Sequence, residues 1–230
     1  MNAADAVFDA ELVIFDCDGV LVDTEPLTNR LLAACVSEAG WAISTSDSIR
    51  MFKGHDLNEI VLEVERRVGR PLPDLLPTYR ARMFEAFARE AIAPIEGAIE
   101  LLDALDRSHA SAARPRRCVA SNGPMNKMHA SLTSAGLIGR FHHAGEPRLY
   151  SAYEVGLWKP DPALFLHAAR DMASAPASCI VIEDSTSGVV AARRAGMPVV
   201  ALAGLTPAAS LVEAGATLVI EHLRELLPTK

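Results

Sequence analysis

The chain has few cysteines, and they are scattered. Four occur in 230 residues, at positions 17, 35, 118 and 179, and no two of them form a Cys-x-x-Cys pair. A small secreted scaffold held by disulfides would need more cysteines at closer spacing. This usage therefore indicates reduced thiols and predicts a cytoplasmic location.

Long apolar runs and an excess of positive charge are also missing. No run approaches the ~20 apolar residues that cross a bilayer, and residues 1–10 lack the basic and apolar regions of a signal peptide. Asp and Glu number 29 against 22 Lys and Arg, which gives a formal net charge of −7. This charge argues against a nucleic acid or an anionic membrane as partner. We expect a monomer or a dimer that acts on a small molecule.

Two kinds of sequence pattern divide the chain. Residues 11–23 and 97–228 alternate short apolar runs with helical patterns, which is typical of a doubly wound parallel sheet. Residues 25–92 read as helical throughout. We therefore predict an α/β core of residues 1–24 and 93–230, with a small all-helical cap, residues 25–92, inserted after the first strand. Strands are expected near 12–16, 117–121, 141–144, 179–182, 198–201 and 217–220.

Helical periodicity is clear inside the insertion. Apolar residues recur at helical spacing in three stretches, led by Leu27, Leu57 and Leu76. Gly40 and Gly69 follow the first two stretches, where a glycine is a common helix end. The insertion thus predicts a helical bundle joined to the core at two hinge points, near residues 24 and 93.

The most informative segment is Asp-Cys-Asp-Gly-Val-Leu-Val-Asp-Thr-Glu, residues 16–25, which follows the apolar run of residues 12–15. Side chains alternate along a strand, so Asp16 and Asp18 project to one side if the extended backbone continues. Two adjacent carboxylates repel each other. Such a pair at a strand end indicates either a divalent cation or acid–base chemistry. Cys17 alternates to the other side and is interpreted as a packed strand residue.

Three later segments also place polar groups beside strand ends. Ser121 and Asn122 follow one apolar run, and Pro124 is suited to a helix start, where backbone N–H groups can hold a phosphate. Lys159 stands just before another helix start, at Asp161 and Pro162. Glu183 and Asp184 end a further apolar run. Each segment alone fits an ordinary turn. In an open α/β sheet, however, ligands bind outside the carboxyl ends of the strands, so these groups are expected to converge on one site.

The four segments DCDGVLVDTE, SNGP, WKPDP and IEDS resemble the four motifs of the haloacid dehalogenase-like hydrolase superfamily, in its phosphatase and phosphomutase branch. The resemblance covers the chain from about Leu12 to Leu226. Within the β-phosphoglucomutase-like subgroup, residues 52–54, 121–128 and 158–165 are similar to bacterial 6-phosphogluconate phosphatases. The resemblance implies a Mg²⁺-dependent phosphomonoester hydrolase that acts through an aspartyl-phosphate intermediate on a small sugar phosphate or phosphorylated sugar acid.

The resemblance also implies roles for single residues. Asp16 is the nucleophile and Asp18 the general acid and base. Ser121 and Lys159 hold the oxygens of the transferring phosphoryl group, and Asn122 is a further substrate-binding residue. The Mg²⁺ ligands are Asp16, Asp18 through its backbone carbonyl, and Asp184, while Glu183 supports the ligands or adds to them. Lys53, beside Gly54 in the insertion, is the candidate contact to the non-reacting part of the substrate.

Alternatives remain open at this point. Phosphomutases of the subgroup usually carry a histidine shortly after the Asp-Thr pair, whereas Thr28 occupies the corresponding position here and residues 28–32 contain no histidine. This difference favours a phosphatase over a mutase. A metal-independent dehalogenase usually lacks the second aspartate, which is present as Asp18. A non-catalytic binding domain would not need the complete set of polar residues.

Overall fold

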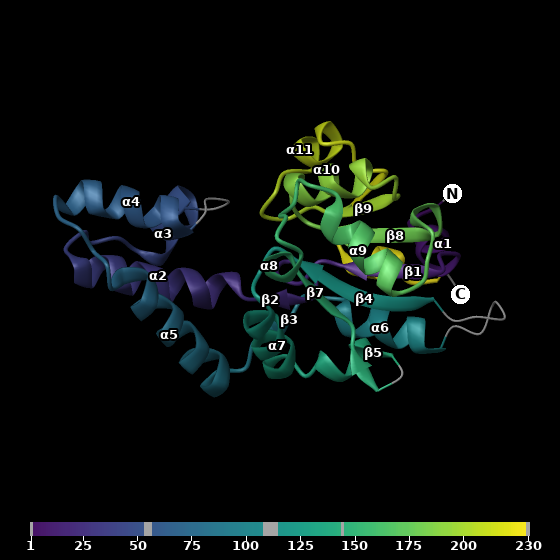
Figure 1. Ribbon diagram of the computed structural model, residues 1–230, viewed down its shortest axis with the longest axis horizontal. Coiled ribbons are helices and arrows are strands. Elements are labelled where there is room, and N and C mark those ends of the chain that lie inside the picture. Colours follow the sequence, from purple (N-terminus) through teal and green to yellow (C-terminus); the bar gives the residue numbers. More distant parts are fainter. Residues whose placement is uncertain (1, 53–56, 108–114, 144, 229–230) are drawn as a thin grey trace. The chain divides into compact units, whose positions relative to one another are not determined.

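Six parallel strands form the sheet around which most of the chain is built (Figure 1). The computed structural model describes residues 2–52, 57–107, 115–143 and 145–228. The strand order is β10-β9-β8-β1-β4-β7. The strands are β1 Leu12–Phe15, β4 Arg116–Ser121, β7 Leu149–Ser151, β8 Cys179–Glu183, β9 Val199–Leu202 and β10 Leu218–Ile220.

The central strand fixes the register of its neighbours. Phe15, the last residue of β1, pairs with Val119 of β4 on one side and with Ile182 of β8 on the other. All three strands run in the same direction, so their carboxyl ends lie at one edge of the sheet. The residues that follow Phe15, Val119 and Ile182 are therefore brought together by the sheet itself.

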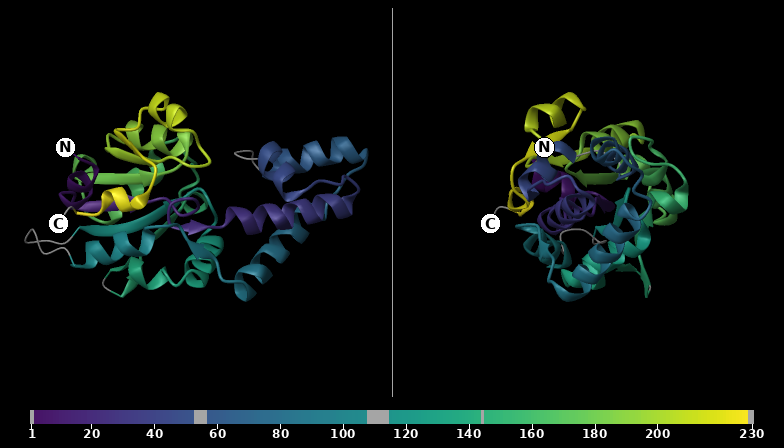
Figure 2. Two further views of the ribbon diagram at one scale, coloured as in Figure 1. Left: turned by 180° about the vertical axis from the view of Figure 1, so that it is seen from behind. Right: turned by 90° about the vertical axis from the view of Figure 1, so that its left-hand side faces the viewer.

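Helices cover both faces of this sheet, as the two views of Figure 2 show. Helices α9, α10 and α11 lie on one face and α6 and α7 on the other (Figure 1). Their bounds, with those of the two short helices at the sheet ends, are α1 Ala3–Phe8, α6 Ala98–Arg107, α7 Met125–Ser134, α8 Ala152–Val155, α9 Ala163–Asp171, α10 Thr186–Arg194 and α11 Ala208–Glu213. The 3₁₀ turns among the described residues of this unit are η1 Ile138–Phe141, η2 Pro176–Ser178 and η3 Leu223–Leu226.

The alternation of β1 divides the core between the two faces. Leu12 and Ile14 are fully buried in the cluster that includes Leu164 and Phe165 of α9. Phe15 projects from the other face, where its ring meets that of Phe141 edge to face with 5.8 Å between centroids. Because β1 is apolar on both faces, it is a central strand, as its unbroken apolar run predicts.

One strand was predicted in the wrong place. Instead of a sheet strand at 141–144, the chain forms a two-residue strand, β5 His142–His143, that pairs antiparallel with β6 Glu146–Pro147. Gly145, with φ +86°, supplies the reversal between them. The strand at the β4 edge of the main sheet is β7, whose residue Leu149 pairs with Val119. Phe141 itself turns into the core from η1 and is buried.

The inserted helical unit comprises Thr24–Ile92, and the α/β unit comprises Met1–Asp23 with Ala93–Lys230. The insertion leaves and re-enters through a short antiparallel pair, β2 Val22–Asp23 and β3 Ala93–Pro94. The predicted fold class, a parallel α/β sheet with a helical insertion after its first strand, is confirmed.

Within residues 24–52 and 57–92, the described part of the inserted unit, four helices form: α2 Glu25–Ala39, α3 Thr45–Phe52, α4 Leu57–Val68 and α5 Leu75–Arg89. Helix α2 packs against α3 and α5, and it buries Leu32 and Val36. Gly40 ends α2 in the left-handed conformation, with φ +116°, and its N–H donates to the Ser37 carbonyl. No helix in the described part of the chain is both long and apolar enough to cross a membrane.

Candidate active site

Lys159 is the centre of the polar groups at the carboxyl edge of the sheet. Its ammonium nitrogen donates to Asp16 Oδ1 at 2.5 Å and to Glu183 Oε1 at 2.7 Å. It also donates to the backbone carbonyl of Ala120 at 2.8 Å. Asp16 follows β1, Ala120 is in β4 and Glu183 ends β8, so one lysine joins three adjacent strands. Lys159 is only 6% exposed and Glu183 only 1%.

The backbone of Lys159 is held by hydrogen bonds as well. Asn122 accepts the Lys159 N–H through Oδ1 at 2.9 Å and donates through Nδ2 to the Lys159 carbonyl at 3.2 Å. The lysine ammonium also lies 4.8 Å from the centre of the Phe165 ring, a distance suited to a cation–π contact. Asn122, predicted as a substrate-binding residue, thus positions the loop that carries Lys159.

Glu183 is held on both carboxylate oxygens. Its Oε1 accepts from Lys159, and its Oε2 accepts the backbone N–H groups of Asp184 at 2.9 Å and Ser185 at 2.8 Å. The Ser185 hydroxyl donates to the same oxygen at 2.8 Å and accepts the N–H of Gly188, which caps α10. These donors fix the orientation of the buried Glu183 carboxylate.

Asp18 and Ser121 form the more exposed side of the group. Lys127, in the first turn of α7, donates to Asp18 Oδ2 at 2.7 Å. The Ser121 hydroxyl accepts the N–H of Gly123 at 3.0 Å. A methyl group at Gly123 would lie 3.4 Å from Ser121 Oγ and 3.9 Å from Asp18 Oδ2. Both oxygens therefore border the same turn before α7.

Asp184 lies against the loop that carries the two aspartates. A methyl group at Gly19 would come within 2.3 Å of Asp184 Oδ2, and Gly19 adopts φ +83°. The Asp184 carboxylate therefore occupies space that any other residue at position 19 would need. This contact places the end of β8 beside the segment that follows β1.

Burial of several like charges shifts the pKa values of the group. Burial raises the pKa of Asp16 from 3.8 to about 7; Lys159 opposes this change, and Glu183 and Asp18 add to it. Burial and the neighbouring Glu183 likewise raise the pKa of Asp184 well above its usual range. For Lys159, burial alone would lower the pKa, but Asp16 and Glu183 outweigh it and raise the value.

The charges fit a divalent cation. When Asp16, Asp18, Glu183 and Asp184 are all ionised, they carry two more negative charges than Lys127 and Lys159 neutralise, and a bound cation would offset this excess. In the described part of the chain, no three or more His, Cys, Asp or Glu side chains are arranged to hold a metal alone. Mg²⁺ needs fewer, since it is usually bound by one or two carboxylates together with substrate oxygens and water.

Comparison with known proteins settles the family. The sequence profile of the haloacid dehalogenase-like hydrolases matches residues 13–202. The chain belongs to this family. The 6-phosphogluconate phosphatase of Escherichia coli (strain K12) is 37% identical over 191 residues, which cover 82% of this chain and 80% of that protein.

Two solved structures of the haloacid dehalogenase-like type share the fold. A family hydrolase from Deinococcus radiodurans R1, with bound phosphate and sodium, has a TM-score of 0.75 at 31% identity and covers 96% of this chain and 94% of its own. A candidate β-phosphoglucomutase from Thermotoga maritima has a TM-score of 0.78 at 25% identity, covering 94% and 96%. The family resemblance inferred from the four motifs is thereby confirmed.

The structure brings together most of the residues that the motifs of this hydrolase family single out. Asp16, Lys159 and Glu183 are in direct contact, and Asp184 lies against Gly19. Lys53 falls outside the described residues, so its predicted substrate contact stays a prediction. Cys17 is buried, as expected, and its sulfur lies 3.9 Å from Ser131 Oγ.

Lys127 is the site residue that the motif analysis missed. It stands inside the segment SNGPMNKM, residues 121–128, which was noted only for its resemblance. A signal was available. The N-terminus of a helix carries partial positive charge, so a lysine in the first turn is disfavoured unless an anion lies close by. Here that anion is Asp18.

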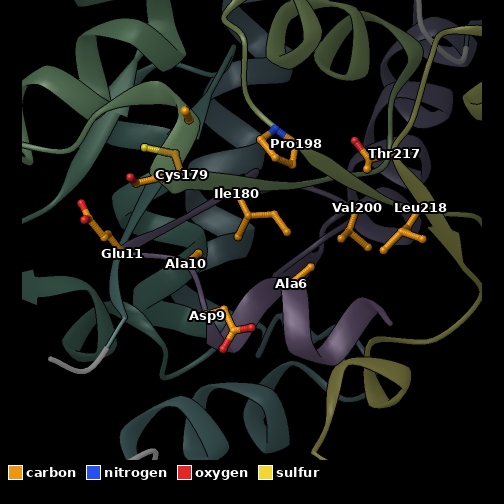
Figure 3. A pocket seen from close by; sticks show the side chains of 12 residues that line it. Ala6, Asp9, Ala10, Glu11, Cys179, Ile180, Pro198, Val200, Thr217 and Leu218 are labelled. Carbon is orange, nitrogen blue, oxygen red and sulfur yellow. The ribbon is translucent and has the colours of Figure 1, made fainter. Parts of the chain in front are cut away.

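The opposite edge of the sheet holds a different hollow, shown in Figure 3. It has a volume of about 590 Å³ and lies at the amino ends of β8, β9 and β10, beside α1. Its lining is mostly apolar, with Asp9 and Glu11 at one side. None of the family's motif residues lines it, so it is separate from the group around Lys159.

Proposed function

We propose that this protein is a Mg²⁺-dependent phosphomonoester hydrolase that acts through a phosphorylated Asp16. The observation that carries the proposal is the buried contact of Lys159 with Asp16 and Glu183 at the carboxyl ends of adjacent strands. An anionic nucleophile is repelled by a phosphate group unless cations neutralise the charge around it. A lysine in direct contact with the carboxylate that reacts supplies part of this neutralisation.

In the first step, an Asp16 carboxylate oxygen forms a bond to phosphorus while the bond from phosphorus to the substrate's ester oxygen breaks. Asp18 gives a proton to the departing oxygen, which leaves as an alcohol. In the second step, a water oxygen attacks phosphorus and Asp18 takes its proton. The bond to Asp16 then breaks, inorganic phosphate leaves, and the Asp16 carboxylate is restored.

Other residues hold the phosphoryl group during both steps. Lys159 and the Ser121 hydroxyl would bind its oxygens, aided by backbone N–H groups at the start of α7. Asp16, Asp184 and the Asp18 backbone carbonyl would hold Mg²⁺, with Glu183 supporting them. When bound, Mg²⁺ supplies positive charge that stabilises the phosphoryl oxygens as negative charge shifts in the transition state.

For the substrate, we propose a small sugar phosphate or phosphorylated sugar acid, with 6-phosphogluconate as the first compound to test. The relative with 37% identity is named for that activity. A mutase would return the phosphoryl group to a second sugar hydroxyl instead of to water. Thr28, at the position where mutases of the subgroup carry histidine, donates its hydroxyl to the carbonyl of Thr24, the residue before α2, at 2.9 Å. A threonine in this arrangement supplies no titrating group, which favours water as the acceptor.

The decisive experiment measures phosphate release from 6-phosphogluconate with and without Mg²⁺, for the wild-type protein and for Asp16→Asn. We expect one phosphate per substrate consumed, no activity after chelation of Mg²⁺, and a loss of at least about 10³-fold in Asp16→Asn. The asparagine keeps the size of the side chain but loses its nucleophilic charge. A folded Asp16→Asn variant with near-normal turnover would refute the proposal. Conversion of β-glucose 1-phosphate to glucose 6-phosphate without phosphate release would identify a mutase.

A further inference from the structure

Each of the two aspartates after β1 has its own lysine. Asp16 is bound by Lys159, from the loop before α9, and Asp18 is bound by Lys127, from α7. The two pairs differ in environment. The Lys159 and Asp16 side chains are 2% and 12% exposed, whereas those of Lys127 and Asp18 are 20% and 26% exposed. The second pair thus lies where solvent and a ligand can reach it.

The contact between Lys127 and Asp18 is part of an extended packing of α7 against the aspartate segment. One helical turn after Lys127, the Ser131 hydroxyl faces the Cys17 sulfur at 3.9 Å. Residues four apart lie on one face of a helix. The face of α7 that carries Lys127 and Ser131 therefore packs against Asp18 and Cys17. Lys127 is therefore directed at Asp18 by the helix and is not a lysine that reaches it from a distant loop.

Without Asp18, the positive charge of Lys127 would be unfavourable at its position in α7. Lys127 is the third residue of α7, and a cation in the first turn of a helix is disfavoured by the partial positive charge of the helix N-terminus. Ser121 and Gly123 lie at the same turn, since a methyl group at Gly123 would contact Ser121 Oγ at 3.4 Å and Lys127 Cδ at 3.8 Å. The lysine stem thus passes directly beside the proposed phosphate-binding turn.

We propose that Lys127 is a positioning residue for the Asp18 carboxyl group, an inference that rests on the proposed phosphatase function. Its bond to Oδ2 fixes the rotation of the carboxyl group and so the direction in which the other oxygen faces the ester oxygen and later the water. Lys127 itself gives and takes no proton in either step. Asp16 does not depend on it, because that side chain is held by Lys159 and its backbone N–H by Ile182.

This role predicts a dependence on the leaving group. An alkyl alcohol is a poor leaving group and needs a well-placed proton donor, whereas a nitrophenolate leaves without one. Replacing Lys127 by methionine keeps the length of the side chain and removes its charge. Lys127→Met should therefore lower kcat for 6-phosphogluconate about tenfold or more, while single-turnover phosphorylation of Asp16 by 4-nitrophenyl phosphate changes less than threefold.

Three further measurements separate this role from other roles. Lys127→Arg retains a cation and should recover much of the lost kcat. His129→Met, at an exposed position of α7 two residues after Lys127, should match the wild type. The third measurement compares KM for 6-phosphogluconate with KM for a hexitol 6-phosphate, which lacks the carboxylate. The ratio of these two KM values should be the same in Lys127→Met as in the wild type.

The results distinguish a failure of the positioning role of Lys127 from a failure of the proposed phosphatase function. If the wild type is inactive or Asp16→Asn is active, the phosphatase proposal fails. If those controls hold, equal losses on alkyl and aryl phosphates, or no loss on either, overturn the positioning role. A selective rise in KM for the sugar acid also overturns it, since Lys127 would then bind the substrate's carboxylate. Circular dichroism of each variant establishes that it is folded.

Discussion

The carboxylate of Glu183 fills the space that a side chain at Gly188 would need. A methyl group at position 188 would lie 1.8 Å from Glu183 Oε1 and 1.9 Å from its carboxyl carbon. Gly188 is buried inside α10, where alanine is ordinarily favoured over glycine by about 1 kcal/mol. The absence of a side chain at Gly188 therefore determines where Glu183, and through it Lys159, can lie.

We accordingly predict that Gly188→Ala is harmful even though it improves helix propensity. Glu183 must move, so Lys159 loses one of the two carboxylates that hold it. Turnover should fall at least about tenfold, and the protein should melt at a lower temperature. Gly139→Ala is the matched control, since a methyl group there meets no atom within 4 Å. If Gly188→Ala were as stable and active as this control, the packing described for Glu183 would be wrong.

Replacement of Lys159 by methionine should reduce stability as well as activity. The substitution leaves Asp16 and Glu183 as neighbouring buried carboxylates without the cation between them. Breaking a buried ion pair from one side typically costs about 3–5 kcal/mol. Urea unfolding without Mg²⁺ measures this loss. An unchanged midpoint would show that the two carboxylates do not depend on Lys159 for their burial.

Asp18→Asn should lower activity without lowering stability. The Asp18 side chain is 26% exposed and borders solvent, so we expect unfolding by urea to change little. The rate should fall by about 10²–10⁴, as for the loss of a general acid or base. Rapid-quench measurements can follow phosphorylation of Asp16 and its hydrolysis separately. If both steps kept their normal rates, Asp18 would not be the proton donor and acceptor.

Binding of Mg²⁺ should stabilise the protein more at pH 8 than at pH 6. Without metal, burial raises the pKa of Asp16 to about 7, above its value in the unfolded chain. The folded state then binds the extra proton more tightly, and the stability this proton provides is lost as the pH rises through 7. Protons compete with Mg²⁺ for the same carboxylates at pH 6. The shift in melting temperature on adding Mg²⁺ should therefore grow with pH, and it should shrink in Asp184→Asn. An equal shift at both pH values would contradict this account.

The aromatic contact in the core provides a test of stability that is independent of the site. Phe141→Ala removes a buried ring that packs against Phe15 and should cost about 3–5 kcal/mol in denaturant unfolding. Leu166→Ala, on a side chain that is 39% exposed, should change stability by no more than about 0.5 kcal/mol. Comparable losses in both variants would show that Phe141 is not part of the core as described.

The parts of the fold that the sequence predicted are those with strong local signals. The apolar run before Asp16 predicted β1, and the glycine at position 40 marked the end of α2. The strand after η1 was misplaced because the segment around His142 and the true edge strand at Leu149 are both short. What separates them is the turn at Gly145 and pairing with β4, a contact distant in sequence.

For the candidate site, too, the sequence predicted the residues that have a local signal and missed the contacts that depend on packing. Strand ends identified Asp16, Ser121 and Glu183, because a parallel sheet brings its carboxyl ends together whatever the intervening chain does. The contact of Lys127 with Asp18 joins positions 109 residues apart. It depends on how α7 packs over the aspartate segment, and residue spacing does not report that packing. Likewise, Asn122 holds the Lys159 backbone, which its place in the motif did not reveal.

The antiparallel pair between β2 and β3 marks the point at which the helical insertion leaves and re-enters the α/β unit. Asp23 pairs with Ala93, so the ends of the 69 residues between them are already side by side in the α/β unit. Every pairing of the main sheet lies outside that stretch. A shorter or longer insertion could be spliced in at this pair without changing the order or register of the six strands. The carboxyl edge of the sheet, with the polar group around Lys159, therefore does not depend on the length of the inserted helices.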